Sequence, residues 1–318
     1  MAKEKLWSAL IHLGGNMWNE EGNWNGRAGQ PGALASPVLR LDRGLWDRYM
    51  ENLVRVGANA VIIDVGEGML YESHPELAVE GSWTKDEVAK EVARLRAMGL
   101  EPIPKLNFSA GHDIWLQEYS YMLATQKYRD VCADLIREVC EAFTPKHFHL
   151  GMDEETWGIQ KDYYYAVIRQ HDVWWRDFYH LVACCEKANA RPWIWSDYCW
   201  AHPEEFYKKM PKSVVQCNWY YSMALDPAAI TDEKRKLRLE AFEELDRHGF
   251  DQVPTGSNWS HPANMQALTE YCTNHISDEH LMGFMQTPWC LFTEDKKDHL
   301  DQSVEKLGES IAWYNNQK

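Results

Sequence analysis

Eight short apolar segments, most of them separated by amphipathic stretches, are the feature that most constrains the fold of this 318-residue chain. Each segment has the length of a buried strand, and the stretches between them carry apolar residues at three- and four-residue spacing, as helices packed on one face do. The predicted strands cover residues 6–13, 59–65, 101–107, 147–153, 191–197, 213–219, 250–256 and 282–289, and the clearest helices cover residues 41–57, 84–99, 128–143 and 232–249. This repetition predicts an α/β protein of the parallel (β/α)8 TIM barrel type, with a doubly wound open sheet as the alternative.

Residues at the ends of the predicted helices support this division. Gly57, Gly99 and Gly249 follow three of the helices, at the position where a left-handed residue commonly ends a helix. Thr84 and Glu87 have the spacing of a capping box at the start of another.

The chain shows no linker and no change of composition that would divide it. We therefore expect a single barrel over residues 1–318, without a separate N-terminal domain and with a long first loop at about 14–40. Several predicted strands end in polar or aromatic residues, namely Asp64, Asn107, Asp153, Asp197 and Trp289. This favours the barrel, because barrel active sites assemble at the C-terminal ends of the strands.

Charge and composition bear on the partner. The formal net charge of -15 at pH 7 would repel a phosphate backbone, and no Lys/Arg cluster offsets it, so we expect no nucleic-acid partner. Sixteen Trp and fifteen Tyr instead suggest carbohydrate, because aromatic faces stack on the C–H faces of sugar rings. Buried structural tryptophan is the alternative explanation.

The sequence also bears on location. No segment approaches the ~18 uninterrupted apolar residues of a spanning helix, so no membrane partner is expected. The first ten residues do not resemble a signal peptide. We expect a cytoplasmic protein, or a periplasmic or secreted one whose signal was removed. The eight cysteines lack zinc-like spacing, which predicts free thiols, and nothing indicates an oligomeric state.

Three consecutive carboxylates follow the fourth predicted strand in HFHLGMDEETWG, residues 147–158. Each of Asp153, Glu154 and Glu155 raises the cost of ionising the next. Either the strand ends here in a solvated loop, or two of the acids are catalytic. Successive strand residues face opposite sides, so Asp153 and Glu154 can share one cleft only if the backbone turns at about Met152. We expect Glu155 to face solvent or a neighbouring helix.

Four segments resemble one family, in the right order. HLGMDE (149–154) resembles the His-x-Gly-Gly-Asp-Glu signature of glycoside hydrolase family 20, the β-N-acetylhexosaminidases. EVARLRAMGLEPIPKLNFSAGH (91–112) resembles the helix and third strand of that family, and WIWSDYCW (193–200) and GFMQTPWCLFTE (283–294) resemble its fifth and eighth strands. The resemblance covers about residues 41–300 and implies a glycosidase that needs no metal or organic cofactor.

The resemblance also implies a mechanism. The nucleophile is the substrate's own 2-acetamido oxygen, and the intermediate is an oxazolinium ion. Glu154 is then the general acid and base, and Asp153 orients the acetamido group and stabilises the positive charge. An ionised Asp153 also helps to keep Glu154 protonated near neutral pH. The implied substrate is a β-linked N-acetylhexosaminide of the GlcNAc or GalNAc type.

Further substrate-binding positions are carried over from the family. A histidine supports the acid, tryptophans wall the acetamido group and stack on the sugar, a tyrosine binds the acetamido oxygen, and acids bind hydroxyls. The matching positions are His112 and His149, then Trp195, Trp219 and Trp289, then either Tyr220 or Tyr221, and finally Asp197 and Glu294, with Asp64 added from its strand end. Tyr220 stands nearer the strand, but the residues alone do not choose between the two tyrosines.

The chain departs from the family pattern at several positions. Met152 replaces the second Gly of the signature, Ala110 replaces a Pro, and Asn107 stands where an acid is usual. The first strand lacks the Arg that family members use to hold the sugar's 3- and 4-hydroxyls, which puts sugar specificity in doubt.

Three alternatives remain open. His147 and His149 lie on one strand face, which suits a metal-dependent barrel hydrolase. A barrel that binds glycan without cleaving it is the second. The third is a retaining glycosidase with its own carboxylate nucleophile about 5 Å from the acid, which Glu294 or Asp197 could supply.

Overall fold

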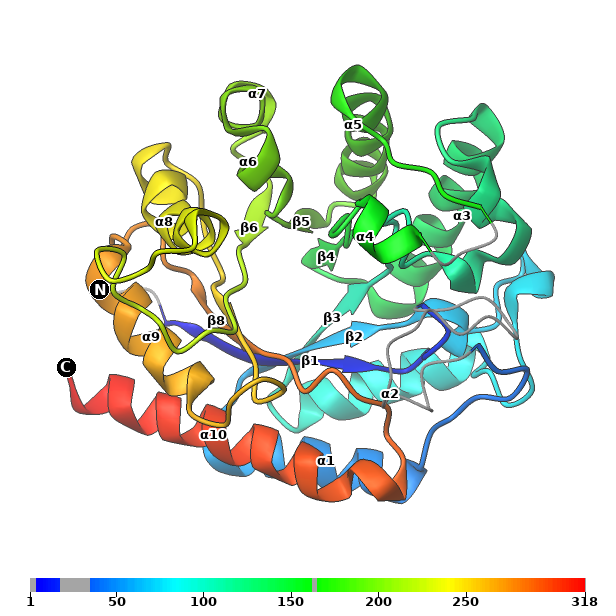
Figure 1. The fold of residues 1–318 in the computed structure, drawn as a ribbon. Coiled ribbons are helices and arrows are strands. Elements are labelled where there is room, and N and C mark those ends of the chain that lie inside the picture. The colour runs from blue at the N-terminus through cyan, green and yellow to red at the C-terminus, as the bar shows by residue number, and fades with distance from the viewer. Residues whose placement is uncertain (1–3, 18–34, 162–164, 318) are drawn as a thin grey trace.

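The computed structural model of the protein describes residues 4–17, 35–161 and 165–317. Most of the long first loop predicted at about 14–40 therefore lies outside the described residues. Within them, the predicted (β/α)8 TIM barrel is confirmed, and it forms a single domain (Figure 1).

Eight parallel strands form one sheet in the order β6-β5-β4-β3-β2-β1-β8-β7. The strands are β1 (Leu6–His12), β2 (Ala60–Asp64), β3 (Glu101–Lys105), β4 (His147–His149), β5 (Arg191–Trp195), β6 (Val215–Cys217), β7 (Thr255–Gly256) and β8 (Gly283–Gln286). Isolated bridges between Gln216 and Gln252 and between Trp219 and Thr255 join the β6 and β7 segments, so the sheet closes on itself. β7 is shorter than the predicted strand because Pro254 precedes it and cannot donate to a ladder.

Helices surround the strands (Figure 1). They are α1 (Arg43–Val56), α2 (Lys85–Ala97), α3 (Gln126–Phe143), α4 (Trp157–Gln160), α5 (His171–Lys187), α6 (Tyr198–Ala201), α7 (Pro203–Lys209), α8 (Glu233–Arg247), α9 (Asn264–His275) and α10 (Lys297–Asn316), with 3-10 turns η2 (Gly66–Gly68), η3 (Pro75–Leu77), η4 (Ile114–Met122) and η5 (Glu294–Lys296). All four predicted helices are confirmed, and Thr84 and Glu87 form the expected capping box of α2. The sequence pattern alone does not single out α5, α9 and α10.

The core has two layers that follow the alternation of side chains along each strand. Leu10, Ile62 and Ile103 point into the barrel, where they pack with the tryptophans of β5. The neighbouring Ile11 and Val61 point outward and pack against the helices. Burial of both layers stabilises the barrel and fixes where each strand ends.

A row of polar side chains closes the barrel interior at the C-terminal ends of three adjacent strands. His12, Asp64 and Lys105 are in register on β1, β2 and β3, and all three are buried. Burial alone would raise the pKa of Asp64, but the Lys105 ammonium and His12 outweigh it and lower that pKa. Burial lowers the pKa of His12. Asp64 and Lys105 therefore form an ion pair inside the barrel.

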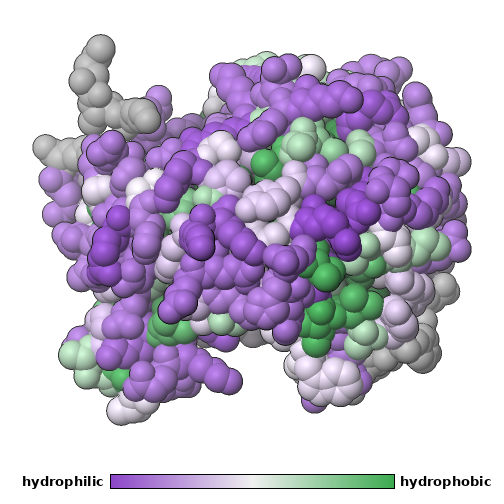
Figure 2. Space-filling view, turned by 90° about the horizontal axis from the view of Figure 1, so that it is seen from above, coloured by the Kyte–Doolittle hydropathy of each residue, from purple (hydrophilic) through white to green (hydrophobic). Residues whose placement is uncertain are grey.

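The outer surface is largely hydrophilic in the view of Figure 2, with smaller apolar areas between the polar ones. In the described part of the chain, every helix is too short or too polar to cross a bilayer. The eight cysteines are free thiols, as predicted.

Candidate active site

The backbone reverses direction directly after β4. The strand ends at His149, and Gly151, Met152 and Glu154 then adopt φ angles of 72°, 68° and 51°. Left-handed backbone is uncommon for a residue with a side chain and costs about 1–3 kcal/mol where it is imposed. The reversal removes the strand alternation, and so Asp153 and Glu154 turn toward one side.

Neighbouring strands hold this reversal in place. The Gly151 N–H donates to His149 Nδ1 at 3.0 Å, and the Gly151 carbonyl accepts from the Trp195 N–H at 3.1 Å. A Cβ at Gly151 would lie 2.4 Å from Asn107 Oδ1, so only glycine fits this close approach to the segment after β3. Asn107 and Gly151 thus form one unit.

Asp153 is fixed from the same segment by Ser109. The Asp153 N–H donates to Ser109 Oγ at 2.7 Å, and Ser109 Oγ lies 2.6 Å from both Asp153 Oδ1 and Asn107 Oδ1. Asp153 is only 8% exposed. Its carboxylate is therefore held in one orientation, which the role of an orienting group requires.

Glu154 lies beside Asp153 but is more open to solvent. Its side chain is 33% exposed, and its Oε2 lies 3.3 Å from Nε2 of the buried His112. The same His112 nitrogen lies 3.6 Å from Asp153 Oδ2. Both carboxylates therefore face one imidazole, and Glu154 is the more exposed of the two.

Asp197 supports the pair from the end of β5. Its Oδ2 accepts a hydrogen bond from the Glu154 N–H at 2.8 Å. Its buried Oδ1 has no hydrogen-bond partner among the described residues. Burial, with the nearby Asp153 charge, raises the pKa of Asp197 to about 8, so this carboxyl is mostly protonated at neutral pH.

Aromatic rings line the barrel mouth beside the acids. The centroid of the Trp195 ring lies 4.6 Å from that of the His149 ring and 5.9 Å from that of the Trp289 ring. Trp289 Nε1 donates to the Tyr221 hydroxyl at 3.0 Å, and Trp219 stacks on the Tyr221 ring at 5.1 Å. This continuous apolar wall suits the faces of a sugar ring.

The structure distinguishes the two tyrosines. Burial, together with the charges of Asp153 and Glu154, raises the pKa of Tyr221, which keeps it a neutral phenol beside the acids. Tyr220 instead donates its hydroxyl to the Ala224 carbonyl within its own loop. Tyr221 is therefore the tyrosine that belongs to the cluster.

Two more predicted residues lie apart from the cluster. Asp64 is paired with Lys105 within the barrel, so its carboxylate is already neutralised. Glu294 is exposed at the first residue of η5, and its carboxylate has no hydrogen bond or ion pair with another described residue. The sequence correctly places Asp64 at the end of a strand and Glu294 soon after one, but it does not show where a side chain points.

Glu155 turns away from the cluster, as expected, but into a buried ion pair rather than into solvent. Arg169, just before α5, donates through Nε to Glu155 Oε2 at 3.1 Å and also pairs with Asp177 of α5 at 3.2 Å. The Ala110 N–H donates to Glu155 Oε1 at 3.1 Å. Arg169 thus neutralises the third acid and braces the loops that carry His112 and Glu154.

The histidine pair of the metal hypothesis is already engaged. His147 Nδ1 accepts from Trp193 Nε1 at 2.9 Å, and His149 Nδ1 accepts from the Gly151 N–H. Neither histidine belongs to a group of three possible ligands among the described residues. His112, Asp153 and Glu154 do form such a group, with one ligand atom from each within 4.8 Å of the others.

Sequence reasoning missed three supporting residues. Ser109 is one of the small residues of the SAGH segment, and nothing in the sequence marks it as the partner of Asp153. Arg169 lies 14 residues from Glu155, the acid that it neutralises. Arg40, at the end of the first loop, donates to the Gly15 carbonyl at 3.2 Å and to Asn16 Oδ1 at 3.3 Å, which brings an arginine to the segment that follows β1. The first strand itself has no arginine, and Arg40 lies in the loop that follows it.

Comparison with solved structures identifies the architecture. The GH20 β-N-acetylhexosaminidase of Streptomyces coelicolor superposes with a TM-score of 0.63 over 95% of this chain and 64% of its own, at 11% identity. A Streptomyces plicatus β-hexosaminidase mutant in complex with GlcNAc gives 0.63 over 96% and 62%, at 13% identity. The exo β-N-acetylglucosaminidase of Vibrio harveyi gives 0.60 over 95% and 54%, also at 13% identity. The chain has the fold of the GH20 catalytic barrel.

Sequence comparisons add a distant relative of this GH20-type barrel. The lacto-N-biosidase of Bifidobacterium bifidum is 28% identical over 134 residues, which cover 37% of this chain and 12% of the relative. No family model matches the chain. The chain spans less than two thirds of the three solved chains above and about one eighth of the curated relative.

Gly151→Ala tests the packing of the reversal in the GH20-type barrel. We expect it to destabilise the protein more than Gly99→Ala, because Gly99 has a similar φ of 92° but nothing within 4 Å of its added Cβ. Gly99→Ala should therefore cost only the left-handed strain, about 1–2 kcal/mol. Urea unfolding of both variants measures the difference, and equal losses would show that the contact with Asn107 is unimportant.

Asp197→Asn tests the protonated carboxyl. An acid whose pKa rises from about 4 to about 8 on folding makes the folded state lose stability as pH rises between those values, because the unfolded chain ionises first. An asparagine at position 197 does not ionise, so it removes this loss of stability. We expect the unfolding free energy of the variant to fall less steeply between pH 4 and 8 than that of wild type. The exposed Asp298→Asn controls for the lost formal charge, and parallel curves for wild type and Asp197→Asn would refute the assignment.

Proposed function

We propose that the protein hydrolyses β-linked N-acetylhexosaminides with retention, through attack by the substrate's acetamido oxygen and an oxazolinium intermediate. The observation that carries the proposal is the reversal after Gly151, which brings two adjacent carboxylates of different exposure to one imidazole beside an aromatic wall. The GH20-type fold and the names of the matched enzymes support the same substrate class.

Glu154 takes the role of general acid and then general base. It is the more exposed carboxylate, so it can reach the oxygen between the bound sugar and a leaving group outside the barrel. A negative charge on Asp153 favours retention of the Glu154 proton before the bond breaks. His112, at 3.3 Å, can bind Glu154 when it is ionised after that proton has been transferred.

Asp153 takes the role of the orienting group. Ser109 holds its carboxylate, which can then accept the acetamido N–H and direct the carbonyl oxygen toward the anomeric carbon. The same negative charge stabilises the oxazolinium ion as it forms. Tyr221, kept as a phenol, is placed to donate to the acetamido oxygen, and Trp195 and Trp289 pack on the sugar and its acetyl methyl.

Arg40 is the candidate for holding the sugar hydroxyls that β1 itself leaves without an arginine. It is held in the first loop by the Gly15 carbonyl and the Asn16 side chain. A guanidinium there offers several donors to adjacent hydroxyls.

A protein-derived nucleophile is less well supported. Asp197 lies near Glu154, but its raised pKa leaves it protonated at neutral pH, and a neutral carboxyl is a poor nucleophile. Glu294 lies apart from the cluster. The substrate's own acetamido group is therefore the preferred nucleophile.

The test is an assay on aryl β-N-acetylglucosaminide, β-N-acetylgalactosaminide and β-glucoside, with and without a thiazoline mimic of the cyclic intermediate. We expect turnover of an acetamido substrate, competitive inhibition by the mimic and little turnover of the glucoside. Glu154→Gln should lower kcat by a factor of roughly 10² to 10⁴. Asp153→Asn should lower kcat and weaken inhibition by the mimic.

Glu279→Gln is the matched control, because Glu279 is exposed at the opposite end of the barrel, before β8. Equal turnover of the glucoside, or turnover insensitive to the thiazoline, would contradict acetamido participation. Glycan binding that is unaffected by Glu154→Gln, with no turnover by wild type, would instead favour the glycan-binding alternative.

A further inference from the structure

A second cluster of possible metal ligands lies outside the acid cluster. His171 is the first residue of α5, His202 lies between α6 and α7, and Glu205 is in α7. One ligand atom from each lies within 4.8 Å of the other two. His171 Nδ1 is 3.0 Å from Glu205 Oε2, and the two imidazole rings lie 4.9 Å apart at 72°.

We propose that His171, His202 and Glu205 bind a divalent transition-metal ion of the Zn²⁺ type, which links the start of α5 to α7. Two imidazoles and one carboxylate are a recurrent zinc ligand set, with water in the fourth position. Ca²⁺ and Mg²⁺ prefer oxygen ligands alone, so the two nitrogen donors favour zinc and its neighbours. The site does not depend on the proposed glycosidase activity.

Each ligand is available to an incoming ion. The His171 side chain is 64% exposed, which gives an ion access from solvent. Lys209 occupies Glu205 Oε1 at 2.7 Å, but Oε2 remains on the side of His171.

The surrounding structure holds the two imidazoles close together. His171 has a left-handed φ of 51°, and its N–H donates to the Tyr198 hydroxyl at 2.8 Å. The Tyr198 ring packs on His202 at 4.5 Å and stacks on the buried Trp174 at 4.1 Å. Imposed left-handed backbone is typical of functional sites. The backbone of His171 and the ring of His202 are thus held by Tyr198 before an ion binds.

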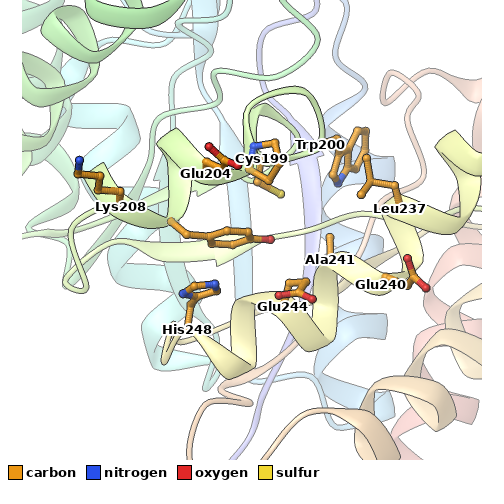
Figure 3. Close-up of a pocket in the computed structure, with 11 residues that line it drawn as sticks. Cys199, Trp200, Glu204, Lys208, Leu237, Glu240, Ala241, Glu244 and His248 are labelled. Atoms are coloured by element: carbon orange, nitrogen blue, oxygen red, sulfur yellow. The ribbon is translucent and has the colours of Figure 1, made fainter.

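The position of α7 explains what such a link would do. α7 has seven residues, and it lines a cavity of about 620 Å³ together with residues of α6 and α8 (Figure 3). Glu204 and Lys208 of α7 are among the residues that line this cavity, as are Glu240 and Glu244 of α8. A helix of seven residues is marginally stable by itself, so a metal link to α5 would stabilise it.

The link would also reach the acid cluster. α5 begins two residues after Arg169, the partner of Glu155, and α6 begins directly after Asp197. The ion would therefore join the two segments that flank Glu154. We expect its effect on stability to be larger than its effect on the chemistry.

The experiment measures zinc binding to the EDTA-treated 318-residue protein by competition with a chromophoric chelator, together with the Co²⁺ absorption spectrum and the Tm with and without Zn²⁺. We expect one equivalent of zinc to bind per chain, and we expect Zn²⁺ to raise the Tm. We also expect a visible Co²⁺ absorption band typical of a low coordination number. His202→Gln and Glu205→Gln should each lose the equivalent and the rise in Tm, while their metal-free Tm shows that they fold.

Two variants serve as controls. His275→Gln removes a histidine paired with a single carboxylate, Glu243, at 2.9 Å, and should keep the equivalent. His112→Gln alters the other possible ligand group and should also keep it. No bound equivalent in wild type would overturn the proposal. Loss of the equivalent in His112→Gln with retention in His202→Gln would also overturn it, by assigning the ion to the acid cluster.

Discussion

The close approach of Gly151 to Asn107 is the constraint on which the candidate site depends. With no Cβ at Gly151, the chain leaving β4 can turn against the segment after β3, and Met152 and Glu154 are then held in left-handed conformations. Without that turn, Asp153 and Glu154 would face opposite sides of the strand. The barrel places β3 and β4 side by side, and the reversal after β4 brings the residues that follow the two strands together in the candidate site.

The reversal gathers four acids, and the structure gives each a different electrostatic environment. Glu155 is neutralised by Arg169 within the protein. Burial and the charge of Asp153 raise the pKa of Asp197, which favours its protonated form. Asp153 is held by Ser109, and Glu154 is left at the opening beside His112. One fixed carboxylate and one accessible carboxylate remain, which is the division of labour that substrate-assisted hydrolysis needs.

Much of this could be predicted from the sequence, and the limits have physical causes. The positions of the strands and of the main helices follow from apolar periodicity, because periodicity reflects burial directly. Asp153 and Glu154 are neighbours in the chain, so a family signature in the sequence can include both. The choice of Tyr221 over Tyr220, the pairing of Asp64 with Lys105 and the burial of Glu155 against Arg169 depend on side-chain directions and on residues distant in sequence. Apolar periodicity gives no information on side-chain directions or on contacts between residues distant in sequence.

The measurement that tests the central claim most directly is a crystal structure of the Glu154→Gln variant with a β-linked N-acetylglucosamine disaccharide bound. The account predicts that the acetamido N–H donates to Asp153, that the carbonyl oxygen points at the anomeric carbon, and that the side chain at position 154 contacts the glycosidic oxygen. A sugar bound with its acetamido group away from Asp153, or with both side chains on a single hydroxyl, would contradict it.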